Sequence, residues 1–201
     1  MPTTFRRSPL ALAVLGLLED GPLHPYGMQQ LLRQWGKDQV VNVEQRATLY
    51  KMINRLAEAG LIRVRETSRD TQYPERTSYE LTDIGRAAST QWMQEILSTP
   101  RNEFPEFPAA LSFLPMITPQ AGLSHLSRRR DQLRRRLDDH DALLEREAAL
   151  PRVTMLETEY LRAQTQAELT WLDGVLAALT DGSLSWSREE LRAVTAQWPA
   201  E

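Results

Sequence analysis

Polar and basic side chains recur at helical spacing along residues 46–58, shortly before a glycine at position 60. At about 100° per residue, the apolar residues of this segment share one face of a helix, formed by Leu49, Met52, Ile53 and Leu56. The opposite face carries Ala47, Tyr50, Lys51, Asn54 and the acid Glu58, and its flanks carry Arg46, Thr48 and Arg55. Basic and hydroxyl side chains bind phosphate oxygens, and an Asn amide matches the major-groove edge of adenine. This face therefore has the chemistry needed to recognise double-stranded DNA.

A solvated outer face is the plain alternative, because charged residues on the outside of a helix usually face only water. The elements predicted on either side of this helix help to decide between a DNA-binding face and a solvated one. Helical patterns precede the segment at residues 9–18 and 26–35, and Asn42 with Gln45 forms a capping box for a helix predicted over about residues 43–59. Alternating residues after Gly60 predict a hairpin of strands 61–67 and 77–81, and a further helix begins near residue 83. This order is that of a winged helix-turn-helix.

The predicted hairpin has a long polar loop that could contact DNA beside the helix. Arginines lie on the loop and its flanks at positions 63, 65, 69 and 76, and the loop also holds Gln72 and Tyr73. Three acids in the same region, Glu66, Asp70 and Glu75, oppose this positive charge. The residues by themselves therefore leave DNA binding and a solvated surface equally open.

A change of composition near residue 100 indicates two domains. Prolines at positions 100, 105, 108, 115 and 119 interrupt the helical pattern, and long helical patterns cover residues 120–150 and 153–180. We predict a winged-helix domain over residues 1–99, a proline-rich joint over 100–119 and an antiparallel helical domain over 120–201. The second long helix has two apolar stripes, one of them containing Leu156, Tyr160 and Ala163, so a partner chain is expected to cover one.

Composition and charge narrow the class of protein. The 201 residues include no cysteine, which excludes disulfides, thiol catalysis and thiolate zinc sites. The longest apolar run, residues 10–18, is too short to span a bilayer and has no cleavage site after it, so neither a signal peptide nor a membrane helix is expected. The formal charge is −3, but residues 1–99 carry +1 and the remainder −4. Any nucleic-acid surface must therefore be a local patch.

The pattern of titratable residues argues against an enzyme and against a metal or cofactor site. His24, His125 and His140 are scattered, and no metal-binding, phosphate-loop or nucleophile-elbow motif is present. His24 is expected to cap or pack against a helix, and His140 to lie at a dimer interface. The arginine-rich segment 127–141 is expected to pair with acids about one turn away on its own helix.

Several motifs together resemble the PadR family of bacterial transcriptional regulators. They are LAVLGLLEDGPLHPYGMQQLL at 12–32, TLYKMINRLAEAGLI at 48–62 and YELTDIGR at 79–86. The second half is also similar to the family's helical C-terminal domain, through residues 107–114, the arginines at 128–130 and residues 168–186. The resemblance covers about residues 9–186.

The resemblance implies a homodimer that is held by its C-terminal helices, binds a roughly palindromic operator and usually represses transcription. Because the chain has no cysteine, the protein is expected in the cytoplasm. It places Thr48, Tyr50, Lys51 and Asn54 in the major groove, with the wing contacts between Arg69 and Arg76. Some relatives respond to small aromatic compounds, for which Trp92 and Trp171 are the candidate contacts here. A protein–protein adaptor that has the winged-helix shape but does not bind DNA is the alternative function.

Overall fold

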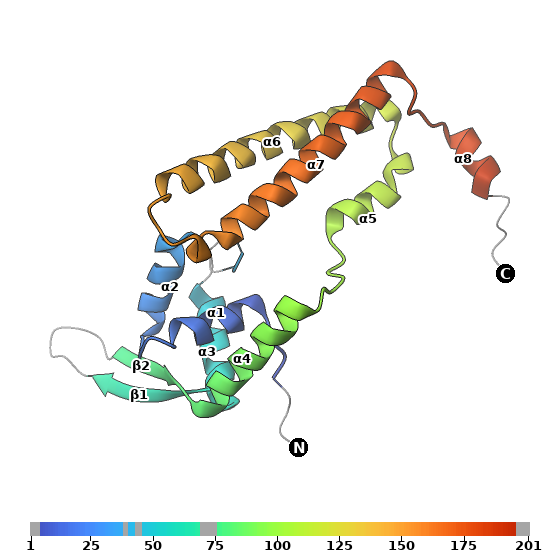
Figure 1. Ribbon diagram of the computed structural model, residues 1–201. Helices are drawn as coiled ribbons and strands as arrows, with labels where there is room; N and C mark the ends of the chain where they lie inside the picture. Colours follow the sequence, from blue (N-terminus) through green and yellow to red (C-terminus); the bar gives the residue numbers. More distant parts are fainter. Residues whose placement is uncertain (1–4, 38–39, 43–45, 69–75, 196–201) are drawn as a thin grey trace. The chain divides into compact units, whose positions relative to one another are not determined.

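The computed structural model describes residues 5–37, 40–42, 46–68 and 76–195 and is mainly α-helical with a two-stranded antiparallel sheet, as predicted (Figure 1). It divides into two compact units, Met1–Asn102 and Glu103–Glu201, each of which is described by itself below. Within the described residues, none of the helices is long and apolar enough to cross a membrane.

Three helices form the core of the first unit. They are α1 (Pro9–Leu17), α2 (Pro25–Gln34) and α3 (Arg46–Glu58). The Ser8 hydroxyl accepts a hydrogen bond from the Ala11 amide at 3.2 Å, and His24 Nδ1 accepts one from the Gly27 amide at 2.8 Å. His24 is therefore a helix cap, as predicted, and both helices begin with a proline that suits the first turn.

The inward face of α3 is the one that the sequence predicts. Leu49, Met52, Ile53 and Leu56 are all buried, and they join a core that includes Val14 and Leu15 of α1. Since α1 and α2 both pack against α3, the remaining face of α3 points away from the core. The predicted start of this helix, residues 43–45, lies outside the described residues.

The end of α3 leads directly into the hairpin. Gly60 adopts a left-handed backbone with φ of 70°, its amide donates to the Ala57 carbonyl, and the Leu61 amide donates to the Leu56 carbonyl, each at 2.9 Å. This pair of hydrogen bonds is a Schellman motif, which satisfies the last carbonyls of the helix. The chain then forms β1 (Ile62–Ser68) and β2 (Arg76–Leu81), which pair antiparallel with a shift of register between Val64 and Glu66.

A short additional bridge extends the sheet. Leu23 exchanges two backbone hydrogen bonds with Tyr79, at 3.0 and 2.9 Å, so the segment before α2 lies against the outer edge of β2. The sequence does not predict this pairing, because a single bridged residue leaves no alternating pattern.

The helix α4 (Asp83–Ser98) begins against the end of α3. The Thr82 hydroxyl accepts from the Gly85 amide at 3.0 Å and lies 2.7 Å from the Gly60 carbonyl oxygen, to which it donates. The Gly85 backbone approaches Leu61 so closely that an added Cβ would stand 1.9 Å from the Leu61 carbonyl oxygen. Only glycine fits this position without movement of the backbone.

The second unit is built around two long helices. Its elements are α5 (Glu106–Ser112), η2 (Leu114–Met116), α6 (Pro119–Arg146), η3 (Arg152–Thr154), α7 (Leu156–Asp181) and α8 (Arg188–Thr195). Figure 1 shows α6 and α7 side by side and antiparallel, and their shared core consists of Leu126, Leu133, Leu169, Leu172 and Leu176. Both long helices were predicted; α8 was not.

Two details of the second unit differ from expectation. The segment 100–119, predicted as a proline-rich joint, contains α5 and η2, and Phe107 and Leu111 of α5 pack against the core of α6 and α7. The arginines of α6 were expected to pair with acids on their own helix. Instead, two of them pair with acids of α7, Arg129 with Glu168 and Arg134 with Asp173, while Arg130 pairs with the adjacent Asp131 of α6.

We predict that Gly85→Ala destabilises the first unit by about 1–3 kcal/mol, because the new methyl group would overlap the Leu61 carbonyl. A thermal melt followed by circular dichroism measures the change. Gly16→Ala is the matched control: Gly16 lies in α1, nothing stands within 4 Å of its added Cβ, and the substitution is expected to stabilise by up to about 1 kcal/mol. Equal effects of the two substitutions would contradict this account of Gly85.

Candidate nucleic-acid interface

The outward face of α3 is polar and exposed. Thr48, Tyr50, Lys51 and Asn54 all have exposed side chains, and even the Tyr50 ring is 47% exposed. Lys51 makes neither a hydrogen bond nor an ion pair with any residue that the structure describes, so its charge is available to a partner molecule. Ala47, between these side chains, leaves room for close approach of another surface.

Arg46 lies at the start of α3 and is held by α2. Its Nε donates to Gln29 Oε1 at 3.3 Å, and its guanidinium carbon lies 5.4 Å from the centre of the Tyr26 ring. Neither contact neutralises the charge of Arg46, which remains exposed. Arg46 is thereby oriented in the first described turn of α3.

Arg55 lies in the last turn of α3 and is oriented in a similar way. Its guanidinium carbon is 5.2 Å from the centre of the Phe5 ring, while the side chain stays exposed. Aromatic rings therefore hold the arginines at both ends of the helix. The sequence pattern gives no indication of these contacts, because Tyr26 and Phe5 are distant along the chain.

The two arginines of β1 share one acidic partner on β2. Arg63 Nε and Arg65 Nη1 both contact the Glu80 carboxylate, at 2.7 and 2.8 Å. Arg63 most strongly, and then Arg65, hold the pKa of the Glu80 carboxyl below its usual range. The predicted wing residues Arg69, Gln72 and Tyr73 lie outside the described residues; Arg76 begins β2, and its side chain also lies outside them.

The two candidate effector contacts belong to different units. Trp92 on α4 is 9% exposed and stacks on Phe5, with ring centres 5.8 Å apart, so it is part of the first core. Trp171 on α7 is 44% exposed and meets the Phe107 ring edge-on at 6.1 Å. Phe107 also borders a largely apolar groove of about 480 Å³ in the second unit, together with Leu111, Phe113, Met116, His125 and Arg129.

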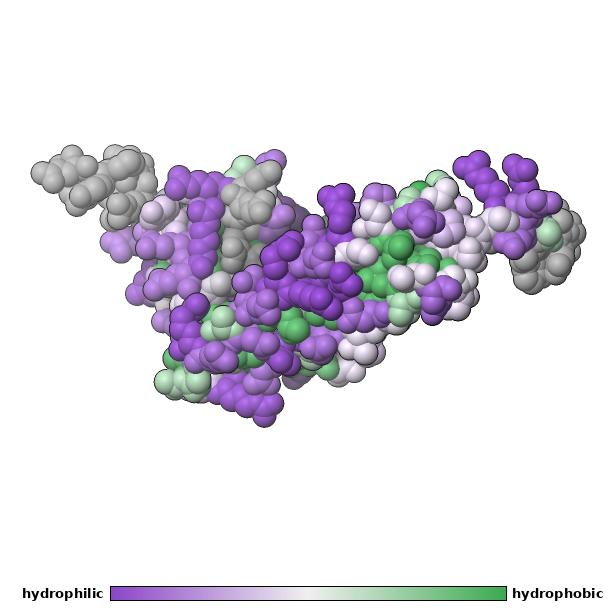
Figure 2. Space-filling model, turned by 90° about the horizontal axis from the view of Figure 1, so that it is seen from above, coloured by the Kyte–Doolittle hydropathy of each residue, from purple (hydrophilic) through white to green (hydrophobic). Residues whose placement is uncertain are grey.

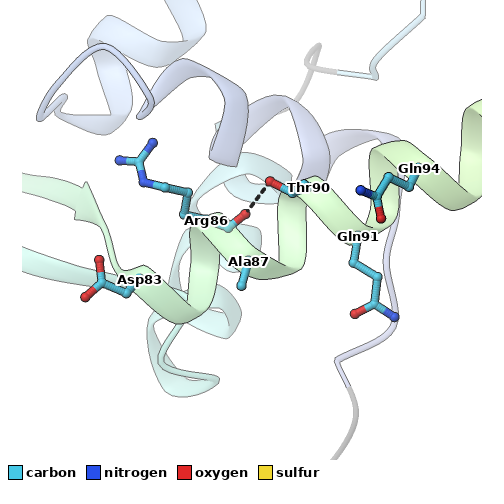
Figure 3. A pocket seen from close by; sticks show the side chains of 6 residues that line it. All are labelled: Asp83, Arg86, Ala87, Thr90, Gln91 and Gln94. Atoms are coloured by element: carbon cyan, nitrogen blue, oxygen red, sulfur yellow. Dashed lines mark hydrogen bonds between the residues drawn. The ribbon is translucent and has the colours of Figure 1, made fainter.

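A second hollow, of about 460 Å³, lies on the exposed face of α4 (Figure 3). Its lining consists of Asp83, Arg86, Ala87, Thr90, Gln91 and Gln94, which project from one helix. The Thr90 hydroxyl donates to the Arg86 carbonyl at 3.0 Å, and Arg86 also pairs with Glu19. The hollow brings together no acid–base pair suited to catalysis. Among the described residues, no cluster of His, Asp or Glu is placed to hold a metal ion.

His140 is buried within the second unit itself. It lies on α6, and only 3% of it is exposed in the single chain. Exposed apolar residues lie elsewhere in the same unit, and Figure 2 shows apolar surface among hydrophilic side chains on one face of the molecule. The apolar stripe of Leu156, Tyr160 and Ala163 is exposed, whereas Leu169, Leu172 and Leu176 of the other stripe of α7 belong to the core.

The three helices, the hairpin and the exposed face of α3 define the first unit as a winged helix-turn-helix domain. Residues 14–91 match the model of the transcriptional regulator PadR-like family, so the chain carries a PadR-like domain. That family consists of transcriptional regulators, which agrees with the prediction that this chain is not an enzyme. None of the curated proteins matches the chain in sequence.

Solved structures resemble the chain over most of its length. PadR of Bacillus subtilis in complex with operator DNA is 22% identical, with a TM-score of 0.69, and the match covers 85% of this chain and 98% of that one. The same regulator with p-coumaric acid is 21% identical, with a TM-score of 0.68 and coverages of 86% and 99%. The virulence activator AphA of Vibrio cholerae is 19% identical, with a TM-score of 0.67 and coverages of 86% and 98%. At these identities the likeness establishes a shared fold.

We predict that the Glu80 carboxyl titrates below the ordinary glutamate pKa of about 4.3, because Arg63 and Arg65 favour its charged form. The ion pairs therefore stabilise the hairpin fully above that value, and the contribution is lost as the pH falls through the lower pKa of the folded protein. Carboxyl carbon chemical shifts measured against pH give the midpoint. In a variant with both Arg63→Gln and Arg65→Gln, the midpoint should rise toward the ordinary value; an unchanged midpoint would refute the assignment.

Proposed function

We propose that the protein is a DNA-binding transcriptional regulator that inserts α3 into the major groove of its operator. The observation that carries the proposal is the exposed face of α3, where Lys51 has no partner among the described residues and Asn54 is also exposed. A helix that served only to complete the core would not need a free cation and a base-matching amide side by side. The PadR-like match over residues 14–91 supports the same function.

The proposed contacts divide by their chemistry. Lys51 and the two aromatic-held arginines, Arg46 and Arg55, bind phosphates, and Thr48 and Tyr50 donate to phosphate oxygens. Asn54 reads an adenine through its paired donor and acceptor. The wing contributes further contacts from Arg69, Gln72, Tyr73 and Arg76 to the backbone or the minor groove.

The regulator is proposed to act in the cytoplasm as a homodimer on a palindromic operator, with residues 1–99 binding DNA, residues 100–119 joining the domains and residues 120–201 forming the dimer. The exposed stripe on α7 supports a second copy as the partner, because exposed apolar side chains such as Leu156 and Tyr160 favour burial. Repression follows if the dimer occupies a promoter and excludes the polymerase.

A small aromatic effector is proposed to release the operator. The related fold that binds p-coumaric acid supports this class of ligand. Of the two candidate contacts, Trp171 is the one with an exposed ring, and it lies against Phe107 at the border of the apolar groove. Trp92 would reach a ligand only after its stacking on Phe5 is disturbed.

We expect Lys51→Ala to weaken binding to every DNA sequence and Asn54→Ala to weaken discrimination at one base pair. The probe is a duplex that the purified protein selects from a random pool, and gel shifts across a salt series give the affinity. Loss of one phosphate contact lowers the slope of log affinity against log salt by about 0.9. Loss of the adenine contact costs about 1–3 kcal/mol against the preferred base.

Arg136→Ala is the control for the change of charge, because Arg136 is an exposed arginine of α6 for which no contact is proposed. It should leave the slope unchanged. Equal affinities of the wild type and Lys51→Ala would contradict the role of α3. An affinity for DNA that is absent, or does not fall with salt, would favour the adaptor function.

The exposed stripe of α7 can be tested as a dimer contact. Leu156→Glu combined with Tyr160→Glu should convert the protein to monomers of 23.0 kDa, because the charges would be buried against the partner chain. Sedimentation equilibrium measures the mass. Gln166→Glu adds a charge at another exposed position of α7 and should leave the dimer intact. A monomeric wild type at all concentrations would contradict the proposed assembly.

A further inference from the structure

The segment that leads into α1, residues 5–8, is held against the first unit in an extended form. Ser8 has extended backbone angles, φ of −148° and ψ of 160°, and the residues before it belong to neither a helix nor a strand. Phe5 and Arg7 contact the body of the unit, whereas Arg6 between them is exposed. This alternation is what an extended chain produces when one of its sides is anchored. We call residues 5–8 the N-terminal arm.

Two anchors on α4 fix the arm. The Phe5 ring stacks on Trp92 at 5.8 Å with an angle of 21° between the ring planes, and the Arg7 guanidinium pairs with Glu95. Trp92 belongs to the buried core, so Phe5 rests on a rigid surface. Phe5 also contacts Arg55 of α3, whose guanidinium carbon lies 5.2 Å from the ring centre. A single ring therefore links α4 to the last turn of α3.

The three arginines near Phe5 differ in whether an acid pairs with them. Arg7 is neutralised by Glu95, whereas neither Arg6 nor Arg55 has an acidic partner among the residues that the structure describes. A guanidinium stacked on a ring uses its face, which leaves the N–H groups at its edge free to donate. Both cations can therefore still bind an anion.

The place of Arg55 on α3 indicates which part of DNA it meets. At about 100° per residue, Arg55 lies about 80° around the helix from Ala47, at the side of the outward face. A side chain at the flank of a helix in the major groove faces the sugar-phosphate backbone more directly than the bases. Arg6 belongs to the arm that passes this flank.

We propose that the N-terminal arm is a further part of the DNA interface, in which Phe5 positions Arg55 and both Arg6 and Arg55 bind phosphates at the border of the groove. The inference rests on the proposed function and adds a phosphate site to it. Phe5 is a positioning residue, since it acts through Arg55 and touches no DNA. Phe5, which is anchored on Trp92 of the core, thus restricts the Arg55 side chain to one orientation.

The first test measures the number of phosphate contacts with the duplex selected from the random pool. Arg6→Gln and Arg55→Gln should each lower the slope of log affinity against log salt by about 0.9 without a change in melting temperature. Arg101→Gln, which removes another exposed arginine of the same unit, should leave the slope as it is. If the Arg6→Gln variant shows the wild-type slope, Arg6 does not bind a phosphate. If the Arg55→Gln variant shows it, Arg55 does not bind a phosphate.

The second test separates positioning from folding. Phe5→Leu keeps an apolar side chain on Trp92 but removes the ring, so the affinity should fall about two- to fivefold in the wild-type background. In the Arg55→Gln background the same substitution should have no further effect, because the cation that Phe5 positions is absent. An equal loss in both backgrounds would show that Phe5 serves only the fold and would overturn its positioning role.

The outcomes also distinguish the arm from the interface on which it depends. If Lys51→Ala weakens binding but Arg6→Gln and Arg55→Gln keep the wild-type slope, the arm and the phosphate contact of Arg55 are refuted, whereas the insertion of α3 into the major groove stands. If the wild-type protein selects no duplex, both are refuted.

Discussion

The junction between α3 and the hairpin is the constraint on which the rest of the first unit depends. The left-handed backbone of Gly60 ends α3, and the Leu61 carbonyl then accepts from both the amide and the hydroxyl of Thr82, at 3.2 and 3.0 Å. Gly85 permits α4 to start in contact with the same carbonyl. The helix α3, the hairpin and α4 are therefore joined at one point, which fixes the outward face of α3 relative to both neighbours.

The distribution of charge explains how a nearly neutral domain can present a cationic face. Glu80 pairs with both Arg63 and Arg65 in the hairpin, and Glu95 pairs with Arg7. The cations on α3 have different surroundings, because Arg46 and Arg55 contact aromatic rings, which orient a guanidinium without cancelling its charge. Acids thus pair with Arg7, Arg63 and Arg65, whereas Arg46 and Arg55 of α3 keep their positive charge.

The sequence predicts whatever depends on local periodicity and misses what depends on tertiary proximity. The buried face of α3, the stop at Gly60, the hairpin and the two long helices all follow from spacing and turn residues. Three kinds of contact join segments that are far apart in the sequence, and local periodicity does not predict them. They are the bridge between Leu23 and Tyr79, the aromatic partners of the arginines, and the ion pairs between α6 and α7. The pairing of Arg63 with Glu80 is an intermediate case: it follows once the hairpin register is known.

The central claim is that the outward face of α3 contacts DNA, and backbone amide chemical shifts measure it most directly. Spectra of the protein are recorded with and without the duplex that it selects from a random pool. The account predicts that the largest shifts fall on residues 46–55 of α3, with smaller ones along the N-terminal arm and the hairpin, and that residues of α6 and α7 in the buried core of the second unit change little. Large shifts elsewhere, with residues 46–55 unperturbed, would contradict it.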